Sequence, residues 1–211
     1  MSRKLVRIFL TAASRADLVG AWARLGFALD ADGAGVTLAD GVALAFAASD
    51  DVARRASVGL SAAPRETPAM LSGEAADCFH LVEAAPVLAA PGHPNGVLSL
   101  REVVAIAQEP ADHAEFLSAL TGQREMLATS AGLNIRLGGA SLEILSPRAF
   151  AFRFGINPRA EKFHIAGLVF GVKNLSETEA VLAANGLMTI FQVGRLAAGE
   201  AEGVAVAFER A

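Results

Sequence analysis

The feature that most constrains this chain is one order of elements that recurs along it: a strand, a helix that ends at a glycine, and then short strands. In the first copy, residues 5–11 alternate in the way of a half-buried strand. Ser14 is a suitable helix N-cap, and Gly26 is a suitable helix stop. Residues 35–38 and 42–47 then predict two strands around an Asp-Gly turn.

The same order returns twice in the second half. One copy predicts a strand at 100–108, a helix that begins near Pro110 and ends at Gly122, and strands at 126–127, 133–137 and 141–145. The last copy predicts a strand at 164–172, a helix with a Ser176–Glu179 capping box that ends at Asn185-Gly186, and strands at 188–193 and 204–208 around a Gly/Ala-rich loop.

Between residues 51 and 96 the pattern is weaker. Strands are predicted at 56–62 and 78–83, with a short helix at 65–71 that Pro68 interrupts and Gly73 ends. The helix-ending glycines then recur at intervals of 47, 49 and 64 residues, which indicates four units with an eroded second copy. Several strands follow each helix, so the sequence predicts an α+β fold of repeated βαβββ modules and not a doubly wound parallel sheet.

Composition excludes several classes of protein. Hydrophobic residues make up 53% of the chain and charged residues 19%, as in a globular protein. The net charge is -4 and the basic residues are scattered, so no nucleic-acid surface is expected. A single cysteine, Cys78, excludes an internal disulfide. No apolar run is long enough to span a membrane, and the first ten residues do not resemble a signal peptide, so we expect a cytoplasmic protein.

Three segments add a family resemblance to the module order: GHPNGVL at 92–98, SLEILSP at 141–147 and LAANGL at 182–187. Together they resemble multi-module glyoxalase-like members of the vicinal oxygen chelate (VOC) superfamily. The resemblance implies the glyoxalase/bleomycin resistance/dioxygenase fold, in which paired modules form incompletely closed, barrel-like mixed sheets around a cleft. We expect residues 1–92 to form the first module pair, with its second module degenerate, and residues 97–211 to form the second pair.

In metal-using relatives, the resemblance implies a His on a module's first strand and a Glu on its last strand. The corresponding positions here fall, for His, near Arg7, Ser57 or Val58, Glu102 and Gly167, and, for Glu, near Ala45, Phe79 or His80, Glu143 and Ala207. Glu143 alone has the family's residue type. We therefore expect no metal site and no cofactor. The alternative is a Zn, Ni, Mn or Fe site rebuilt from Glu102, Glu143 and His164.

The candidate cleft residues are His80, His93, Glu102 and Glu143, and no catalytic residue is assigned. Each has a structural interpretation beside the functional one. His93 lies in a Pro-Asn-Gly turn that connects the module pairs, and Glu143 can pair with a nearby arginine.

The leading prediction is a protein that binds a small, mostly apolar molecule in a cleft without the usual metal. The first alternative is a metal-dependent lyase or dioxygenase with rearranged ligands, supplied for example across a dimer interface. The second is a structural or interaction protein with a collapsed cleft. We also expect a homodimer, because an eroded second module leaves a sheet edge for another chain to cover.

Overall fold

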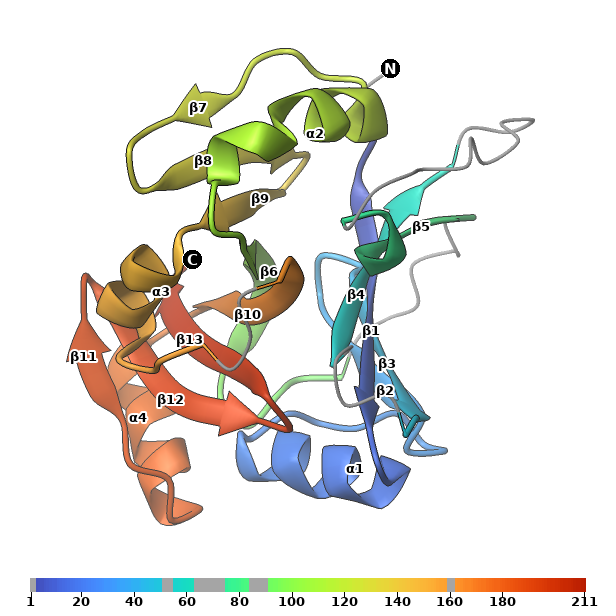
Figure 1. Ribbon diagram of the computed structural model, residues 1–211. Coiled ribbons are helices and arrows are strands. Elements are labelled where there is room, and N and C mark those ends of the chain that lie inside the picture. The colour runs from blue at the N-terminus through green and yellow to red at the C-terminus, as the bar shows by residue number, and fades with distance from the viewer. Residues whose placement is uncertain (1–2, 51–54, 63–74, 84–90, 159–161) are drawn as a thin grey trace.

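The computed structural model describes residues 3–50, 55–62, 75–83, 91–158 and 162–211, and its strands form two mixed sheets (Figure 1). The five-stranded sheet contains β1 (Leu5–Ala12), β2 (Gly35–Thr37), β3 (Ala43–Ala48), β4 (Ala56–Ser61) and β5 (Phe79–Val82). The eight-stranded sheet contains β6 (Val97–Ile106), β7 (Leu127–Ala128), β8 (Gly132–Leu137), β9 (Ala140–Leu145), β10 (His164–Val172), β11 (Ile190–Gln192), β12 (Arg195–Ala201) and β13 (Val204–Arg210). The helices are α1 (Arg15–Arg24), α2 (Ala114–Thr121), α3 (Pro147–Phe154) and α4 (Leu175–Ala184).

Strand order confirms the predicted fold class. In the larger sheet the order is β11-β12-β13-β10-β6-β9-β8-β7, so two βαβββ modules meet where β6 and β10 pair antiparallel. Within each module the first and last strands are parallel neighbours, β6 with β9 and β10 with β13. The smaller sheet repeats this rule, since β1 is parallel to β3 and β4 to β5, while β1 and β4 pair antiparallel. The boundaries of the module pairs at residues 92 and 97 remain a prediction.

Most of the predicted elements form where the local signals place them. Ser14 caps α1, and Gly122 and Gly186 take the left-handed conformation after their helices. The short helix predicted at 65–71 lies outside the described residues. The larger sheet agrees with the open mixed sheet expected of the module pair.

Two sequence-based expectations need correction, and one helix has no counterpart among the predicted elements. The N-cap of α4 is Asn174, which accepts from the Ser176 N–H and contacts Glu177, so the capping box lies two residues before the predicted one. The predicted Gly/Ala-rich loop is strand β12, because its Leu and Ala side chains pack in the core despite their modest strand propensity. Finally, helix α3 was not predicted.

An apolar core joins one face of the larger sheet to α1 and to the smaller sheet. Trp22 of α1 lies at its centre and contacts the rings of Phe27, Phe46 and Phe170 at centroid distances of 5.0, 6.0 and 5.9 Å. A second apolar cluster lies on the opposite face of the larger sheet, under α3. We call this side the α3 face. No helix in the described parts of the chain is long and apolar enough to cross a membrane.

Candidate functional site

Two carboxylates lie side by side on the α3 face of the larger sheet. Glu102 is on β6 and Glu143 is on β9, its parallel neighbour. In the register of β6 and β9, Glu102 lies opposite Ser141, and Glu143 lies opposite Val104. The two acidic side chains are therefore on the same face of the sheet, offset by two residues along the strands. Glu102 is buried, with only 4% of its surface exposed, and Glu143 is partly buried. Two acidic groups in such a place need compensating charge.

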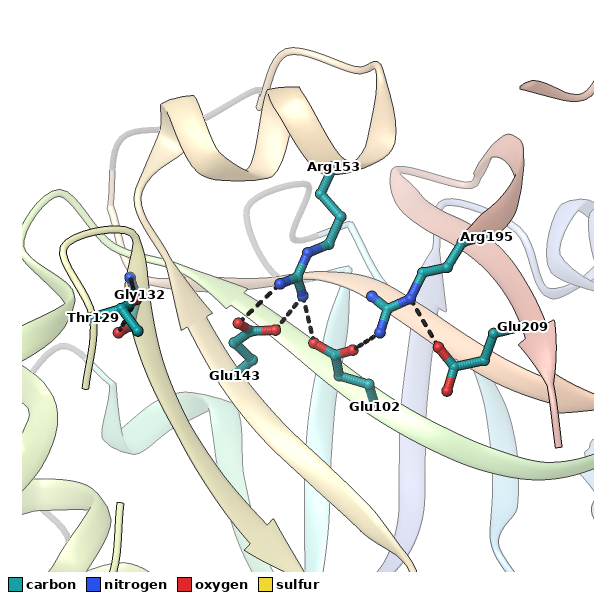
Figure 2. Close-up of polar contacts among 7 residues, drawn as sticks. All are labelled: Glu102, Thr129, Gly132, Glu143, Arg153, Arg195 and Glu209. Carbon is teal, nitrogen blue, oxygen red and sulfur yellow. Dashed lines mark hydrogen bonds and ion pairs between the residues drawn. The ribbon is translucent and has the colours of Figure 1, made fainter. Parts of the chain in front are cut away.

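Helix α3 supplies that charge. It begins at Pro147 after the N-cap Ser146, whose hydroxyl accepts from the Ala149 N–H, and it ends where Gly155 turns left-handed at φ 69°. Phe150 and Phe154, one helical turn apart, stack at 4.6 Å and bury against the sheet. Because these two rings fix the rotation of the helix, the side chain of Arg153 reaches down to the carboxylates (Figure 2).

The charged side chains form a continuous row across the sheet (Figure 2). Arg153 Nη1 lies 2.7 Å from Glu102 Oε1 and also contacts Glu143, and Arg153 Nη2 donates to Glu143 Oε1 at 3.0 Å. Arg195 of β12 continues the row, with Nη2 2.6 Å from Glu102 Oε2 and Nε 2.8 Å from Glu209 of β13. Arg101 lies 3.5 Å from the other oxygen of Glu209. Positive and negative groups therefore alternate from Glu143 to Arg101.

Proton affinity differs between the two carboxyl groups. Burial, together with the hydrogen bond and charge of Glu143, raises the pKa of Glu102 to about 7. Burial alone would also raise the pKa of Glu143, but its hydrogen bonds with Glu102 and Arg153 bring that pKa below its usual value. Burial works against the charge of Arg153, yet its two carboxylate partners raise the pKa of the guanidinium. Of these two carboxyl groups, Glu102 is thus the one that burial and its neighbour favour in the protonated form.

A hollow of about 330 Å³ opens beside the row. Its lining is mainly polar and consists of Arg101, Glu102, Asn134, Arg136, Gly138, Gly139, Ala140, Ser141, Glu143, Arg153, Arg195 and Glu209. We call it the charged pocket. Arg195 is one of these lining residues, and its Nη1 atom is buried and has no hydrogen-bond partner within the described structure.

The residues at the metal positions implied by the family resemblance do not fit a metal ion. Glu102 and Glu143 are already paired with Arg153. Gly167 has no side chain to offer a metal ion, and an added Cβ atom would lie 3.0 Å from the ring of Phe154, closer than an ordinary contact. Across the described ranges, no three His, Cys, Asp or Glu side chains form a group able to hold an ion.

The three candidate histidines lie apart from this row. His93 is buried in the connector between the sheets, where its Nδ1 accepts from the Ala28 N–H at 3.1 Å. His80 lies on β5 with Nε2 3.0 Å from Ser57 Oγ, beside a smaller hollow of about 200 Å³. His164 begins β10, and its Nδ1 contacts the Lys162 carbonyl at 2.8 Å. Of the proposed cleft and metal residues, the structure brings together Glu102 and Glu143.

Sequence reasoning missed the arginines of the row. Arg153 had a local signal, since Ser146 and Pro147 begin a helix, Gly155 ends it, and Phe150 and Phe154 have helical spacing. Arg195 had none, because its partner Glu102 is 93 residues away in the chain.

No protein-family model matches the chain, and no curated protein matches it significantly. Solved structures do. A 2,2',3-trihydroxybiphenyl 1,2-dioxygenase from Sphingomonas wittichii strain RW1 aligns with a TM-score of 0.61 and 14% identity, over 100% of this chain and 91% of that chain. A mutant of 4-hydroxymandelate synthase from Streptomyces coelicolor aligns with a TM-score of 0.60 and 12% identity, over 98% and 92%. A halotolerant catechol dioxygenase aligns with a TM-score of 0.60 and 12% identity, over 100% and 87%.

These comparisons, with the strand order, define the class of fold. The chain has the fold of the vicinal oxygen chelate superfamily, as the sequence resemblance predicted. At such low identity the likeness does not extend to an activity.

Proposed function

We propose that this protein binds a small polar molecule in the charged pocket without using a metal ion. The observation that carries the proposal is the position of Arg153, whose guanidinium lies between Glu102 and Glu143. These are two of the positions at which the family resemblance implies metal ligands. A guanidinium tethered there pairs with both carboxylates, and the polar side chains that line the pocket can bind a ligand by hydrogen bonds.

The apolar ligand that we expected from composition does not suit this pocket. Phe150 and Phe154 fill the apolar part of the α3 face. The hollow beside them is lined mainly by charged and polar side chains. An apolar molecule there would remove charged groups from water and offer no hydrogen bond in return, which is costly.

The alternative of a metal-dependent lyase or dioxygenase receives no support from these donors. Arg153 already pairs with both carboxylates, and Gly167 has no side chain that could bind a metal ion. One observation favours the other alternative, a structural or interaction protein. Phe152 of α3 is 70% exposed, and Phe191 of β11 is 67% exposed. Exposed aromatic side chains of this size occur at protein contacts.

Metal analysis is the first test. Protein purified without chelator is expected to contain no stoichiometric transition ion. About one tightly bound ion per chain would overturn the proposal.

A thermal-shift screen of small polar and small apolar molecules is the second test, with polar compounds expected to stabilise the protein. Ser141→Trp fills the charged pocket and should abolish their effect, whereas Ser57→Trp fills the smaller hollow near His80 and should leave it unchanged. An interaction protein would bind none of the compounds.

The homodimer and the cytoplasmic location expected from the sequence remain predictions. Light scattering of the purified protein tests the first of them.

A further inference from the structure

The charged pocket contains more basic than acidic side chains. Its four basic members are Arg101, Arg136, Arg153 and Arg195, and its three acidic members are Glu102, Glu143 and Glu209. The carboxylates are used within the row of ion pairs, whereas Nη1 of Arg195 has no partner among the described residues. An excess of guanidinium groups in the lining favours a ligand with anionic oxygens.

Glu102 controls how positive the pocket is. One nitrogen of Arg153 contacts both Glu102 and Glu143, so the two carboxylates are close neighbours in a largely buried place. Like charges at short range favour one proton between them, and Glu102 is the more buried of the two. Its pKa of about 7 agrees with this geometry.

A proton on Glu102 also changes what its neighbours can do. Glu102 is the shared acceptor of Arg153 and Arg195. Once it is neutral, its hold on both guanidinium groups weakens, and they become better donors for another anion. Glu143, Glu209, Arg101 and Arg136 complete the charged groups around it.

We infer that the ligand of this pocket is a small anion with carboxylate or phosphate oxygens and that Arg195 holds it. Because Glu102 is the acceptor that Arg153 and Arg195 share, binding of an anion to these arginines favours a proton on Glu102. The inference rests on the proposed binding function and names its ligand class and its pH control. A cation would face four arginines, and a neutral molecule would gain nothing from their charge.

The test is calorimetric titration with four probes at pH 6 and pH 8. Succinate and inorganic phosphate are the anions, and they separate a carboxylate source from a phosphate source. Butanediol and putrescine are the neutral and cationic counterparts of succinate. At least one anion should bind at pH 6. It should bind about tenfold more weakly at pH 8, because at pH 8 Glu102 must first take up a proton. Butanediol and putrescine should not bind.

Variants assign the roles. Glu102→Gln imitates the protonated group, so its affinity for succinate should be the same at both pH values. Phosphate gains a second negative charge between pH 6 and pH 8, so its affinity is compared with that of the wild type at each pH. Arg195→Met should lose binding, and Arg195→Lys, which keeps the charge but removes Nη1, should weaken it. Arg148→Met removes an exposed charge on the same helix as Arg153 and should change nothing.

Each adverse outcome is distinct. If butanediol or putrescine binds and Ser141→Trp abolishes that binding, the proposed function holds and this inference is wrong. Anion binding that is equal at pH 6 and pH 8, or unaffected in both folded Arg195 variants, also overturns it. If no polar molecule binds at all, both proposals fail.

Discussion

The Nη1 atom of Arg153 lies 2.7 Å from Oε1 of Glu102, and the same nitrogen contacts Glu143 on the adjacent strand. Arg153→Met removes this shared partner, which leaves Glu143 without its arginine and Glu102 with Arg195 alone. Breaking a buried ion pair from one side costs about 3–5 kcal/mol, so we expect a loss of this size in the free energy of unfolding at pH 8. Urea denaturation measures it.

The matched control for this prediction is Arg148→Met, on the exposed side of the same helix. Surface substitutions of this kind change the free energy of unfolding by less than about 0.5 kcal/mol. The loss in Arg153→Met should also shrink at pH 5, where Glu102 takes up a proton. An equal loss in both variants would show that Arg153 contributes no more than a surface charge.

Glu102 should make the protein less stable as the pH rises toward 8. Its pKa is about 7 in the folded protein, against an ordinary 4.5, so the folded state holds this proton more tightly than the unfolded chain. The stabilisation is fully present below the ordinary pKa and is lost as the pH rises through about 7. Each unit of pKa difference corresponds to about 1.4 kcal/mol.

Glu102→Gln removes this titration. Relative to the wild type, the variant should therefore gain stability between pH 5 and pH 8, as measured by urea denaturation at unit steps. Glu143 remains in the variant and affects the lower end of the range in the opposite sense, because its pKa is lowered. A difference between the two proteins that is constant with pH would contradict the prediction.

The module order was predictable because its signals are local. Caps such as Ser14 and stops such as Gly122 act on their own helices, and alternation along a strand needs no distant partner. The charged row was not predictable in the same way. Arg195 meets Glu102 through pairing between β12, β13, β10 and β6, and that arrangement depends on the whole sheet.

Helix α3 is an intermediate case. The residues that begin and end the helix, Ser146 and Gly155, are recognisable from the local sequence. Its effect on the site depends instead on the face of the larger sheet against which the helix packs. The bulk of Phe150 and Phe154 on the α3 face decides that the family-implied metal position at Gly167 stays without a side chain. The sequence alone shows that Gly167 lacks a metal-binding side chain, but it does not show that the rings of Phe150 and Phe154 occupy the space beside Gly167.

Because Phe150 and Phe154 pack against Gly167, substitution of this glycine should lower the stability of the protein. An added Cβ atom would lie 3.0 Å from Phe154 Cζ and 3.3 Å from Phe150, closer than ordinary contacts. Overpacking of this kind costs about 1–3 kcal/mol, so Gly167→Ala should lower the free energy of unfolding by that amount.

A double-mutant cycle separates this overpacking from an effect on the strand. Phe154→Leu makes room for the new methyl group, so the double variant should lose less stability than the sum of the single variants. Additive losses would mean that the rings of α3 do not restrict Gly167. Gly139→Ala, at a turn position where a Cβ meets nothing within 4 Å, is the control for a new methyl group.

His93 should contribute to the stability of the fold and not to the binding of the ligand. Its Nδ1 accepts from the Ala28 N–H, so the proton is on Nε2, which donates to the Thr37 carbonyl at 3.2 Å. Burial lowers the pKa of His93, so the unfolded chain binds a proton more readily than the folded protein. The stability that neutral His93 contributes is therefore lost as the pH falls below about 6.5. His93→Phe keeps a ring but leaves both backbone groups unpaired, which should cost about 1–3 kcal/mol at pH 8 and less at pH 5.5.

Urea denaturation at both pH values measures that change, and calorimetric titration of the folded variant with succinate at pH 6 gives the second reading. The connector lies outside the lining of the charged pocket, so the affinity for the anion should match that of the wild type. An affinity loss in a folded His93→Phe protein would return His93 to the binding site, as its position in the GHPNG segment first allowed. Unchanged affinity with lowered stability would assign it to the junction between the sheets.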